Sequence, residues 1–316
     1  MTRIILRQEI EAALPAIDLL AAMEQAFVAW SSGRAVVPPV GEMLFTQPPG
    51  EVHIKYGYVS GEPYYVVKVA SGFYQNPSLG LPSSNGLMLL FSQATGELVS
   101  VVLDEGMLTD QRTAAAGALA ARVFAPEEVR VIGVLGTGIQ AELQLRHLLN
   151  VTECRDVLVW GRGAAQCAAL RRRLADTAYR LRFAESPVQI ARSCQLIVTT
   201  TPATAPLLDA VGPGTHVTAV GSDTAEKQEL SPSLLAAADV VAVDSRTQAA
   251  SRGEVFRAVS AGVLDMARVL ELGEVIGGEQ PGRTDARQIT VVDLTGVATQ
   301  DIAIATAIYR SVTHAD

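Results

Sequence analysis

The pattern of apolar and polar positions changes character twice along the chain. Residues 10–32 repeat apolar positions at helical spacing and end in a Ser-Ser-Gly turn, which predicts one amphipathic helix. Between about 51 and 103, apolar runs at 52–58, 64–70, 86–92 and 98–103 are separated by turn-forming residues. These runs predict antiparallel strands. The alanine-rich stretch 109–124 then predicts a long helix with Thr109 as its cap.

After Pro126, short apolar runs alternate with helical patterns. The predicted strands are 129–135, 156–160, 195–201, 215–221, 239–244 and 289–294, with helices such as 164–176 and 231–237 between some of them. This alternation predicts an α/β fold with a Rossmann-type, doubly wound parallel sheet over residues 114–295. The last helix, 300–311, could return to the first domain. We therefore expect an α+β N-terminal domain of residues 1–113 that is completed by the C-terminal segment 296–316.

Composition and charge exclude several classes of function. The chain has 316 residues, 49% of them hydrophobic, and a net charge of −8, which argues against nucleic-acid binding because that needs a basic surface. No apolar run approaches the length of a membrane helix, and the N-terminus turns acidic at Glu9 instead of continuing as a signal peptide. Cys154, Cys167 and Cys194 lack metal-ligand spacing, as do the histidines. We expect a cytoplasmic protein without a metal or a membrane segment.

The most informative motif is the glycine turn between the first strand and the first helix of the second domain. The sequence 136–141, Gly-Thr-Gly-Ile-Gln-Ala, follows the apolar strand 129–135 and opens a helix with an apolar stripe. In such a GxGxxA turn, Gly136 permits the tight turn, Gly138 lets the backbone approach a pyrophosphate, and Ala141 lets the helix pack on the strand. An ordinary glycine-rich turn is the alternative. The strand–turn–helix context favours a dinucleotide site.

The end of the second strand of such a sheet selects the cofactor. An acidic residue there binds the ribose 2′-hydroxyl of NAD, whereas an arginine accommodates the 2′-phosphate of NADP. Here the strand 156–160 is followed by Gly161 and Arg162, with no carboxylate. NADP(H) is therefore favoured, and NAD(H) remains possible if Arg162 is merely solvated.

Several stretches of the chain match one known family. They are 66–70, 108–115, 136–140, 159–162, 219–223, 229–230, 243–245 and 296–298. Together they make the chain resemble the ornithine cyclodeaminase/mu-crystallin family over nearly its whole length; the arginine–threonine–alanine–alanine element at 112–115 is the most specific. The resemblance implies a homodimer built by the N-terminal substrate-binding domain. It also implies a nicotinamide enzyme that acts on a small α-amino or α-imino acid.

Two cations are candidates for binding the substrate carboxylate. Lys68 and Arg112 come from different segments and could converge as a clamp, with Arg112 offering a bidentate fork. By similarity to the family, Lys68 takes the substrate carboxylate and Arg112 lies between substrate and cofactor. Without that similarity, a lysine in a strand and an arginine in a helix would be expected in solvent.

Asp223 is the candidate catalytic residue. It follows the predicted strand 215–221 at the sheet edge where doubly wound folds bind ligands. A carboxylate there can pair with an iminium and move its proton. In the cyclodeaminases the matching aspartate is the catalytic acid/base, and Lys227 matches a lysine that contacts the cofactor. The alternative for Asp223 is a turn or capping aspartate.

The resemblance also assigns positions that would read alone as ordinary loop or strand-end residues. These cofactor positions are Ser83, Thr201, the backbone of Val217, Thr218, Ala219 and Val220, and Leu294. The glycine turn itself adds Gly136, Thr137, Gly138, Ile139 and Gln140 to the cofactor candidates. Thr295 falls at a substrate-facing position.

The chain departs from the family at two positions. Gly41 stands where members often carry a second carboxylate-binding arginine, and Lys55 stands where ornithine cyclodeaminase has a glutamate for the distal amine. Lys55 could replace the missing cation. It would repel the distal ammonium of ornithine and favour a shorter side chain that is neutral or acidic. The alternative is that Lys55 points to the other face of its strand, because a shift of one residue reverses the side chain.

The leading functional prediction is an NAD(P)-dependent oxidoreductase acting on the C–N bond of such an acid. This class includes ketimine and pyrroline-carboxylate reductases and amino-acid dehydrogenases. One alternative is ornithine cyclodeaminase itself, which converts L-ornithine to L-proline and ammonia with a catalytic nicotinamide. Another is a non-catalytic, crystallin-like protein that holds NADPH, against which the presence of Asp223 argues.

Overall fold

The computed structural model describes residues 2–73 and 75–313 and divides the chain into two compact units. Unit 1 consists of Met1–Arg112 and Val297–Asp316, and unit 2 consists of Thr113–Gly296. The helix α3 (Met107–Phe124) contributes its first residues to unit 1 and the others to unit 2. Thr109 lies inside α3, so the prediction that it caps this helix is wrong. The carboxylate of Asp104 instead accepts a hydrogen bond from the backbone N–H of Leu108.

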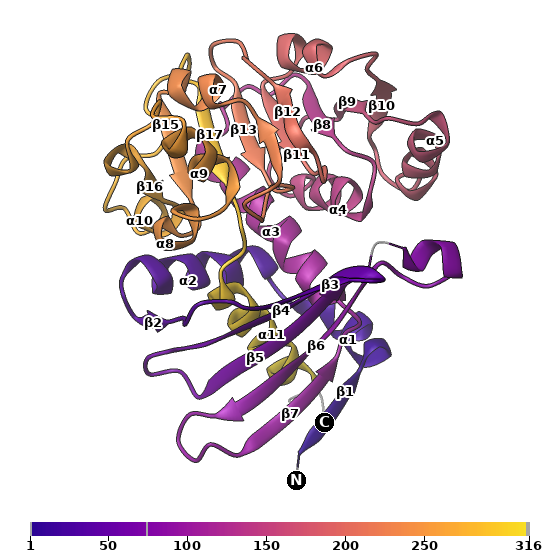
Figure 1. Ribbon diagram of the computed structural model, residues 1–316, viewed down its shortest axis with the longest axis vertical. Helices are drawn as coiled ribbons and strands as arrows, with labels where there is room; N and C mark the ends of the chain where they lie inside the picture. The colour runs from indigo at the N-terminus through magenta and orange to yellow at the C-terminus, as the bar shows by residue number, and fades with distance from the viewer. Residues whose placement is uncertain (1, 74, 314–316) are drawn as a thin grey trace. The chain divides into compact units, whose positions relative to one another are not determined.

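Unit 1 is built on a seven-stranded sheet (Figure 1). Its strands are β1 (Arg3–Leu6), β2 (Ala35–Val36), β3 (Gly41–Thr46), β4 (Pro49–Val59), β5 (Tyr64–Gly72), β6 (Ser84–Ser92) and β7 (Leu98–Leu103). They follow the order β1-β7-β6-β5-β4-β2, with β3 paired to β4. The four predicted strands are confirmed as β4 to β7. The strands β1, β2 and β3 were not predicted, and β1 pairs in parallel with β7, so the sheet is mixed.

The helices of unit 1 come from both ends of the chain. They are α1 (Arg7–Ala13), the 3-10 turn η1 (Leu14–Ala16), α2 (Leu19–Ser31), the 3-10 turn η2 (Asn76–Leu79) and α11 (Ala298–Thr313). The prediction of one helix over 10–32 is wrong, because the chain bends by 91° between Ala16 and Leu19. Pro15 cannot donate within a helix, and Asp18 starts α2 anew by accepting a hydrogen bond from the N–H of Ala21 at 3.0 Å.

In the described part of the chain, no single helix has both the length and the apolar composition to cross a membrane. The bent pair Arg7–Ala16 and Leu19–Ser31 meets that test only when taken together.

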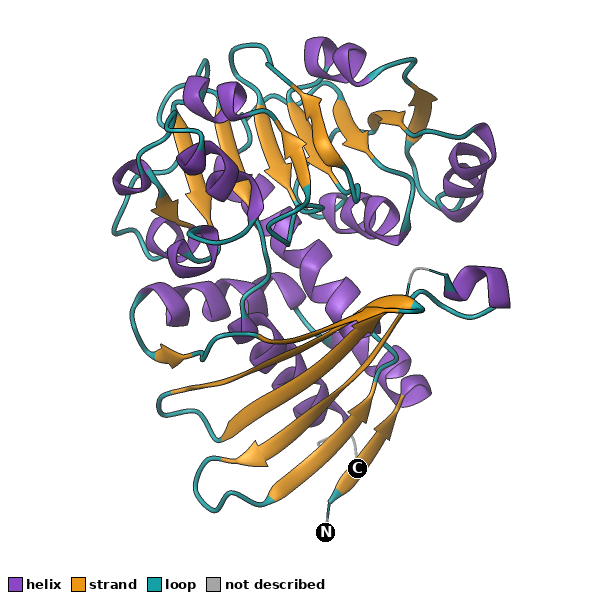
Figure 2. Ribbon diagram, viewed as in Figure 1, coloured by secondary structure: helices purple, strands orange, loops and turns teal. Residues whose placement is uncertain are grey.

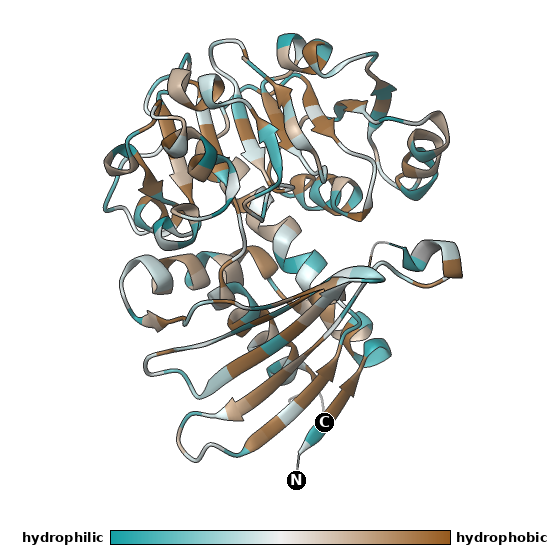
Figure 3. Ribbon diagram, viewed as in Figure 1, coloured by the Kyte–Doolittle hydropathy of each residue, from teal (hydrophilic) through white to brown (hydrophobic). Residues whose placement is uncertain are grey.

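The C-terminal helix α11 completes the core of unit 1. It packs on α2 and on the strands β4, β5 and β6. Its residues Ile304 and Ile308 are fully buried, as are Phe27 of α2 and Met88 of β6. Figure 3 shows long apolar stretches along the strands of this sheet, interrupted by short polar ones. The predicted return of the last helix to the N-terminal unit is therefore confirmed.

Unit 2 contains an eight-stranded, fully parallel sheet. Its strands are β8 (Ile132–Leu135), β9 (Asp156–Trp160), β10 (Arg180–Phe183), β11 (Leu196–Thr199), β13 (His216–Ala219), β15 (Val240–Val243), β16 (Leu270–Glu271) and β17 (Thr290–Asp293). The six predicted strands are confirmed, several of them shorter than expected. The strands β10 and β16 were not predicted, nor was the separate two-stranded sheet of β12 (Thr204–Leu208) and β14 (Gln228–Leu230).

The order of the strands in unit 2 creates a ligand-binding edge. The sheet reads β10-β9-β8-β11-β13-β17-β15-β16, so the chain reverses direction across the sheet between β8 and β11. At such a switch point the loops after two adjacent strands leave toward opposite faces and open a crevice at their carboxyl ends. The prediction of a Rossmann-type sheet is confirmed.

Helices cover both faces of this sheet (Figure 2). They are α4 (Ile139–Leu148), α5 (Ala164–Arg173), α6 (Pro187–Ser193), α7 (Pro232–Ala237), α8 (Arg246–Ala249), α9 (Gly253–Ser260), the 3-10 turn η3 (Met266–Arg268) and α10 (Leu272–Ile276). Because both faces are covered, all four residues of β8 are buried, which explains why this strand is a continuous apolar run in the sequence.

Candidate active site

Unit 1 contains a buried cluster of opposite charges. The Nζ of Lys68, on β5, lies 2.9 Å from Oδ1 of Asp301, on α11, and the Nε of Arg112, on α3, lies 3.3 Å from the same oxygen. The three residues are only 2%, 6% and 1% exposed. The two cations singled out in the sequence are therefore brought together, and the alternative that they point into solvent is excluded.

The charges in this cluster determine the ionisation of its members. Burial lowers the pKa of Lys68, and Arg112 lowers it further, whereas the attraction of Asp301 opposes both effects. Burial alone would raise the pKa of Asp301, but the positive charges of Lys68, Arg112 and Lys55 outweigh it, so the pKa lies below its ordinary value. Asp301 is thus an ionised carboxylate that holds two buried cations.

Lys55 lies on the same side of the sheet as Lys68. The two lysines are direct partners in the antiparallel register of β4 and β5, which places their side chains on one face. This register excludes the alternative in which Lys55 points away. Gly41, which stands where the family often carries an arginine, pairs across β3 and β4 with Ile54, the neighbour of Lys55. Directly paired residues share a face of the sheet, so a side chain at position 41 would lie on the face of Ile54, opposite to Lys55.

Sequence reasoning missed three polar residues of this cluster. Asp301 bridges the cations, and the Oε1 of Gln300 accepts a hydrogen bond from Nη1 of Arg112 at 3.0 Å. Asp104 is 1% exposed, and burial raises its pKa. The signal available was a Gln-Asp pair in the first turns of a helix that is otherwise strongly apolar. Such a pair is costly to bury unless it has charged partners.

Unit 2 has a cavity of about 260 Å³ at the carboxyl ends of β8, β9 and β11. Its lining residues are Gly136, Thr137, Gly138, Trp160, Gly161, Arg162, Thr200, Thr201, Pro202, Ala203 and Leu207. It therefore brings together the glycine turn, Arg162 and Thr201 from the residues predicted to bind a cofactor. It lies where the strand order places the switch point.

The glycine turn in this cavity has the shape that a dinucleotide pyrophosphate requires. Gly136 adopts φ +126°, and a side chain there would collide with the hydroxyl of Thr200. A Cβ on Gly138 would meet only open space. Gly138 also precedes α4 without a capping side chain, so the first N–H groups of the helix face an open site. These groups fit a bound phosphate.

Arg173, the last residue of α5, stabilises the glycine turn through hydrogen bonds. Its Nη2 donates to the carbonyl of Thr137 at 2.9 Å, and its Nε lies 2.6 Å from Oε2 of Glu142 on α4. Ile139 and Gln140, two other predicted cofactor residues, are the first residues of α4, and Ile139 is 47% exposed. Arg162 is exposed at the end of β9, and no acidic residue lines this cavity within the described chain.

A buried glutamate joins the ends of two strands next to this cavity. Oε2 of Glu229 accepts hydrogen bonds from the hydroxyl of Thr199 at 2.7 Å and from the N–H of Gly221 at 2.8 Å. Its Oε1 accepts one from the N–H of Thr201 at 2.6 Å. Sequence reasoning gave Glu229 no role, although its position lies in a stretch that matches the family. The carboxylate fixes the loops after β11 and β13, and Asp223 belongs to the second of these.

Asp223 and Lys227 form an ion pair in the loop after β13. The Nζ of Lys227 lies 2.7 Å from Oδ1 of Asp223, whose side chain is 46% exposed. Asp223 is therefore accessible and already paired with one cation. Neither residue lines the cavity at the glycine turn.

The other residues predicted to bind the cofactor or the substrate lie at several different places in the two units. The backbone of Val217, Thr218 and Ala219 is paired with β11 on one side and β17 on the other, and these three residues do not line the cavity at the glycine turn. Val220 is the first residue beyond the ladder.

Leu294 and Thr295 follow β17 and are buried, and the Thr295 hydroxyl donates to Asp244 at 3.2 Å. Ser83 belongs to unit 1, where its carbonyl accepts a hydrogen bond from Phe73.

The chain is similar to proteins of known classes along its whole length. The model of the ornithine cyclodeaminase/mu-crystallin family matches residues 1–316. A Sinorhizobium fredii protein named an uncharacterized cyclodeaminase is 41% identical over 299 residues, which cover 93% of this chain and 90% of that protein.

Solved structures with the same fold include two that are at least 30% identical to this chain. An archaeal alanine dehydrogenase dimer with bound NAD has a TM-score of 0.91 and 32% identity, and the match covers 99% of this chain and 97% of that one. The iminosuccinate reductase of Paracoccus denitrificans in complex with NAD+ has a TM-score of 0.90 and 30% identity, with the same coverage.

The buried carboxyl groups of unit 2 predict an unusual pH dependence of stability. Burial raises the pKa of Glu254, which accepts hydrogen bonds from the backbone N–H groups of Glu229 and Leu230, from 4.5 to about 7. A carboxyl group whose pKa is raised in the folded state stabilises the fold at low pH, and this contribution is lost as the pH rises through the folded pKa. Between about pH 5 and pH 8, Glu254 should lower the free energy of unfolding by about 3 kcal/mol.

Urea unfolding across this pH range tests this expectation. The wild-type protein should lose stability with rising pH relative to Glu254→Gln, whose side chain does not titrate. The exposed Glu128→Gln is the matched control and should keep the wild-type slope. Parallel pH profiles for wild type and Glu254→Gln would contradict the assignment.

Proposed function

This chain belongs to the ornithine cyclodeaminase/mu-crystallin family, and on that premise we propose that it is an NAD(P)-dependent oxidoreductase acting on the C–N bond of a small α-amino or α-imino acid. The observation that carries the proposal is the buried cluster of Lys68, Arg112 and Asp301. Two cations held on one carboxylate leave an excess of positive charge for a substrate carboxylate. We assign Lys68 and Arg112 to that carboxylate, Arg112 also to the substrate–cofactor boundary, and Thr295 to the substrate.

The proton transfer is assigned to Asp223. An imine accepts hydride readily only when its nitrogen carries a proton, so a carboxyl group beside that nitrogen is required to donate or hold it. The side chain of Asp223 is half exposed and paired with Lys227, which keeps it oriented at the end of β13. A bound nicotinamide supplies the hydride to the α-carbon, or takes it in the reverse reaction.

The cofactor is assigned to the glycine turn and to the cavity beside it. The open N–H groups at the start of α4 would bind its pyrophosphate, and the other cofactor positions inferred from the family, including Ser83, Thr201, Val220 and Leu294, complete the assignment. The solved alanine dehydrogenase and iminosuccinate reductase bind NAD and NAD+. For this chain we propose a preference for NADPH over NADH, because the residues directly after β9 include Arg162 and no carboxylate.

Lys55 narrows the proposed substrate. Its position beside Lys68 adds a third positive charge to the site, which opposes the distal ammonium of ornithine and so argues against ornithine cyclodeaminase itself. The same charge favours a substrate whose side chain is acidic. A relative of this chain from Paracoccus denitrificans, 36% identical, is an iminosuccinate reductase, and iminosuccinate carries two carboxylates.

A panel of amino-acid oxidations and reductive aminations, run with NADPH and with NADH, tests the proposed reaction. A reductase or dehydrogenase changes the cofactor stoichiometrically, whereas a cyclodeaminase returns it unchanged. A non-catalytic, NADPH-holding protein would show binding of the cofactor and no turnover on any substrate.

We also propose that the chain forms a homodimer through the open face of its unit 1 sheet. Ile4 and Leu6 of β1, Tyr56 and Tyr58 of β4, and Leu103 of β7 are 37–56% exposed. They lie on the face opposite the helices, because their neighbours Ile5, Val59 and Val102 are buried. An apolar face of this kind marks an interaction surface. The archaeal alanine dehydrogenase of the same fold is a dimer.

Replacing Asp223 by asparagine should lower kcat by about 10²–10⁴-fold on the best substrate of the panel, because the amide keeps the shape but cannot transfer the proton. Binding of the nicotinamide, followed by its fluorescence, should stay near the wild-type value. The nearby Glu226→Gln is the control and should keep full activity. An Asp223→Asn variant with wild-type kcat would remove this residue from the mechanism.

Replacing Arg162 by alanine should weaken NADPH binding and leave NADH binding nearly unchanged. The loss of charge-assisted hydrogen bonds to the 2′-phosphate should amount to about 1.5–3 kcal/mol. Titration of both cofactors into both proteins measures this difference. Equal affinities of the wild-type protein for NADPH and NADH would refute the proposed preference.

Replacing Lys55 by methionine should raise KM for L-aspartate strongly and leave KM for L-alanine nearly unchanged, since only aspartate has a second carboxylate. The matched Lys68→Met variant should raise KM for both substrates. If Lys55→Met affects the two substrates equally, Lys55 does not contact the side chain of the substrate.

Replacing Tyr58 by lysine should shift the protein from dimer to monomer, because a charge would be buried at the proposed interface. Light scattering after gel filtration measures the mass. Val188→Lys, on an exposed site of unit 2, is the control and should leave the mass unchanged. A wild-type protein that is monomeric at all concentrations would contradict the proposal.

A further inference from the structure

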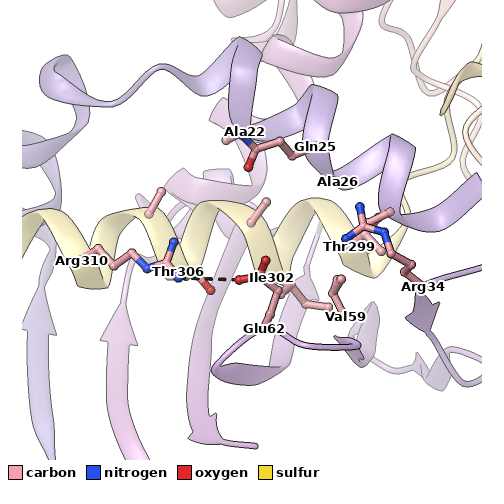
Figure 4. A pocket seen from close by; sticks show the side chains of 13 residues that line it. Ala22, Gln25, Ala26, Arg34, Val59, Glu62, Thr299, Ile302, Thr306 and Arg310 are labelled. Carbon is pink, nitrogen blue, oxygen red and sulfur yellow. Dashed lines mark ion pairs between the residues drawn. The ribbon is translucent and has the colours of Figure 1, made fainter. Parts of the chain in front are cut away.

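Unit 1 has a second cavity, of about 360 Å³, between α2 and α11 (Figure 4). Much of its wall is alanine: Ala22, Ala26 and Ala29 of α2 face Ala303 and Ala307 of α11. Helices packed through larger side chains would fill this space. The cavity therefore results from small residues that recur at helical spacing on both helices.

This cavity is distinct from the charged cluster on Asp301. The residues of α11 that line it are spaced by three or four positions and share one side of the helix. At about 100° per residue, Asp301 points about half a turn away from the side of α11 that lines the cavity. It therefore lies on the opposite side of the helix, toward Lys68 of β5. None of Lys55, Lys68 and Arg112 lines the cavity.

One buried polar atom in the wall of the cavity lacks a partner. Thr299 is 1% exposed, and its Oγ1 makes no hydrogen bond within the described chain. A buried hydroxyl without a partner is costly, with a penalty of roughly 1–3 kcal/mol. This hydroxyl is itself fully buried and therefore has no surface open to the cavity.

Arg34 provides a charge beside this hydroxyl. Figure 4 shows its guanidinium on the side of the cavity where Thr299 lies. Its Nε donates to Ser32 at 3.3 Å, and it has no ion pair among residues 2–73 and 75–313. Arg310 also lines the cavity but is paired with Glu62 at 3.6 Å. The lining therefore carries a net positive charge, concentrated on Arg34.

We propose that this cavity is a binding site for a small monocarboxylate with an apolar body. The carboxylate would take the guanidinium of Arg34, and the body would lie against the alanines and against Ile302 and Val59. A volume of about 360 Å³ falls in the range of small-molecule sites. This site is independent of the reaction proposed above.

Calorimetric titration of the full-length protein with 3-phenylpropionate tests the proposal. The uncharged 3-phenylpropanol and the cationic 3-phenylpropylamine have nearly the same body, so affinity should fall in the order acid, alcohol, amine. Arg34→Gln should weaken binding of the acid roughly ten- to hundredfold and bring it close to the alcohol. The control Arg3→Gln, in the same unit but away from the cavity, should bind the acid like wild type.

Two further variants locate the bound acid. Ala303→Leu fills the cavity and should abolish binding, whereas Lys68→Met removes a cation of the other cluster and should leave it intact. If Ala303→Leu does not fold, the surface variant Arg34→Gln still decides the question. Failure of wild type to bind the acid at millimolar concentration would overturn the proposal. So would binding that is lost in Lys68→Met and unchanged in Arg34→Gln.

Discussion

The ion cluster on Asp301 is the interaction on which the candidate substrate site depends. This carboxylate joins β5, α3 and α11, whose contributing residues Lys68, Arg112 and Asp301 are far apart in the sequence. Removing two cations from water is expensive, and a buried ion pair seldom adds net stability over well-packed apolar residues. Asp301 therefore does more to keep the cations charged and fixed in place than to stabilise the fold. A site for an anion needs cations in this state.

The same arrangement explains why the C-terminal segment belongs to the N-terminal unit. The strands supply Lys55 and Lys68 on one face, and α11, which packs on these strands, brings the carboxylate of Asp301 to Lys68. In α11 that carboxylate follows Gln300, which binds Arg112. One turn of helix thus contacts both cations, and the apolar residues after it anchor the helix to the core.

In unit 2 the positions of the functional groups follow from strand order. The glycine turn after β8 and the loops after β9 and β11 meet in one cavity because the chain reverses at the switch point. Two hydrogen-bonded side chains hold the loops at this edge in place. Arg173 binds the carbonyls of the glycine turn, and Glu229 joins the loops after β11 and β13. Loops that are already fixed before binding lose less conformational entropy when a ligand binds to them.

Features of the fold that depend on neighbouring residues could be predicted from the sequence. The strand periods, the parallel sheet and the Gly136–Gly138 turn all follow from local spacing, because backbone conformation and burial pattern repeat over a few residues. The helix break at Pro15 is also a local feature. It was not predicted because apolar residues recur at helical spacing both before and after this proline.

Tertiary structure alone decided which side chains meet. Asp301 lies 233 positions from Lys68, and the three donors to Glu229 come from two different strand ends. The sequence could not decide which face of the sheet Lys55 occupies, because an error of one residue in the strand register reverses the side chain. Such pairings are fixed by strand order and helix docking, which have no local period for a sequence pattern to reveal.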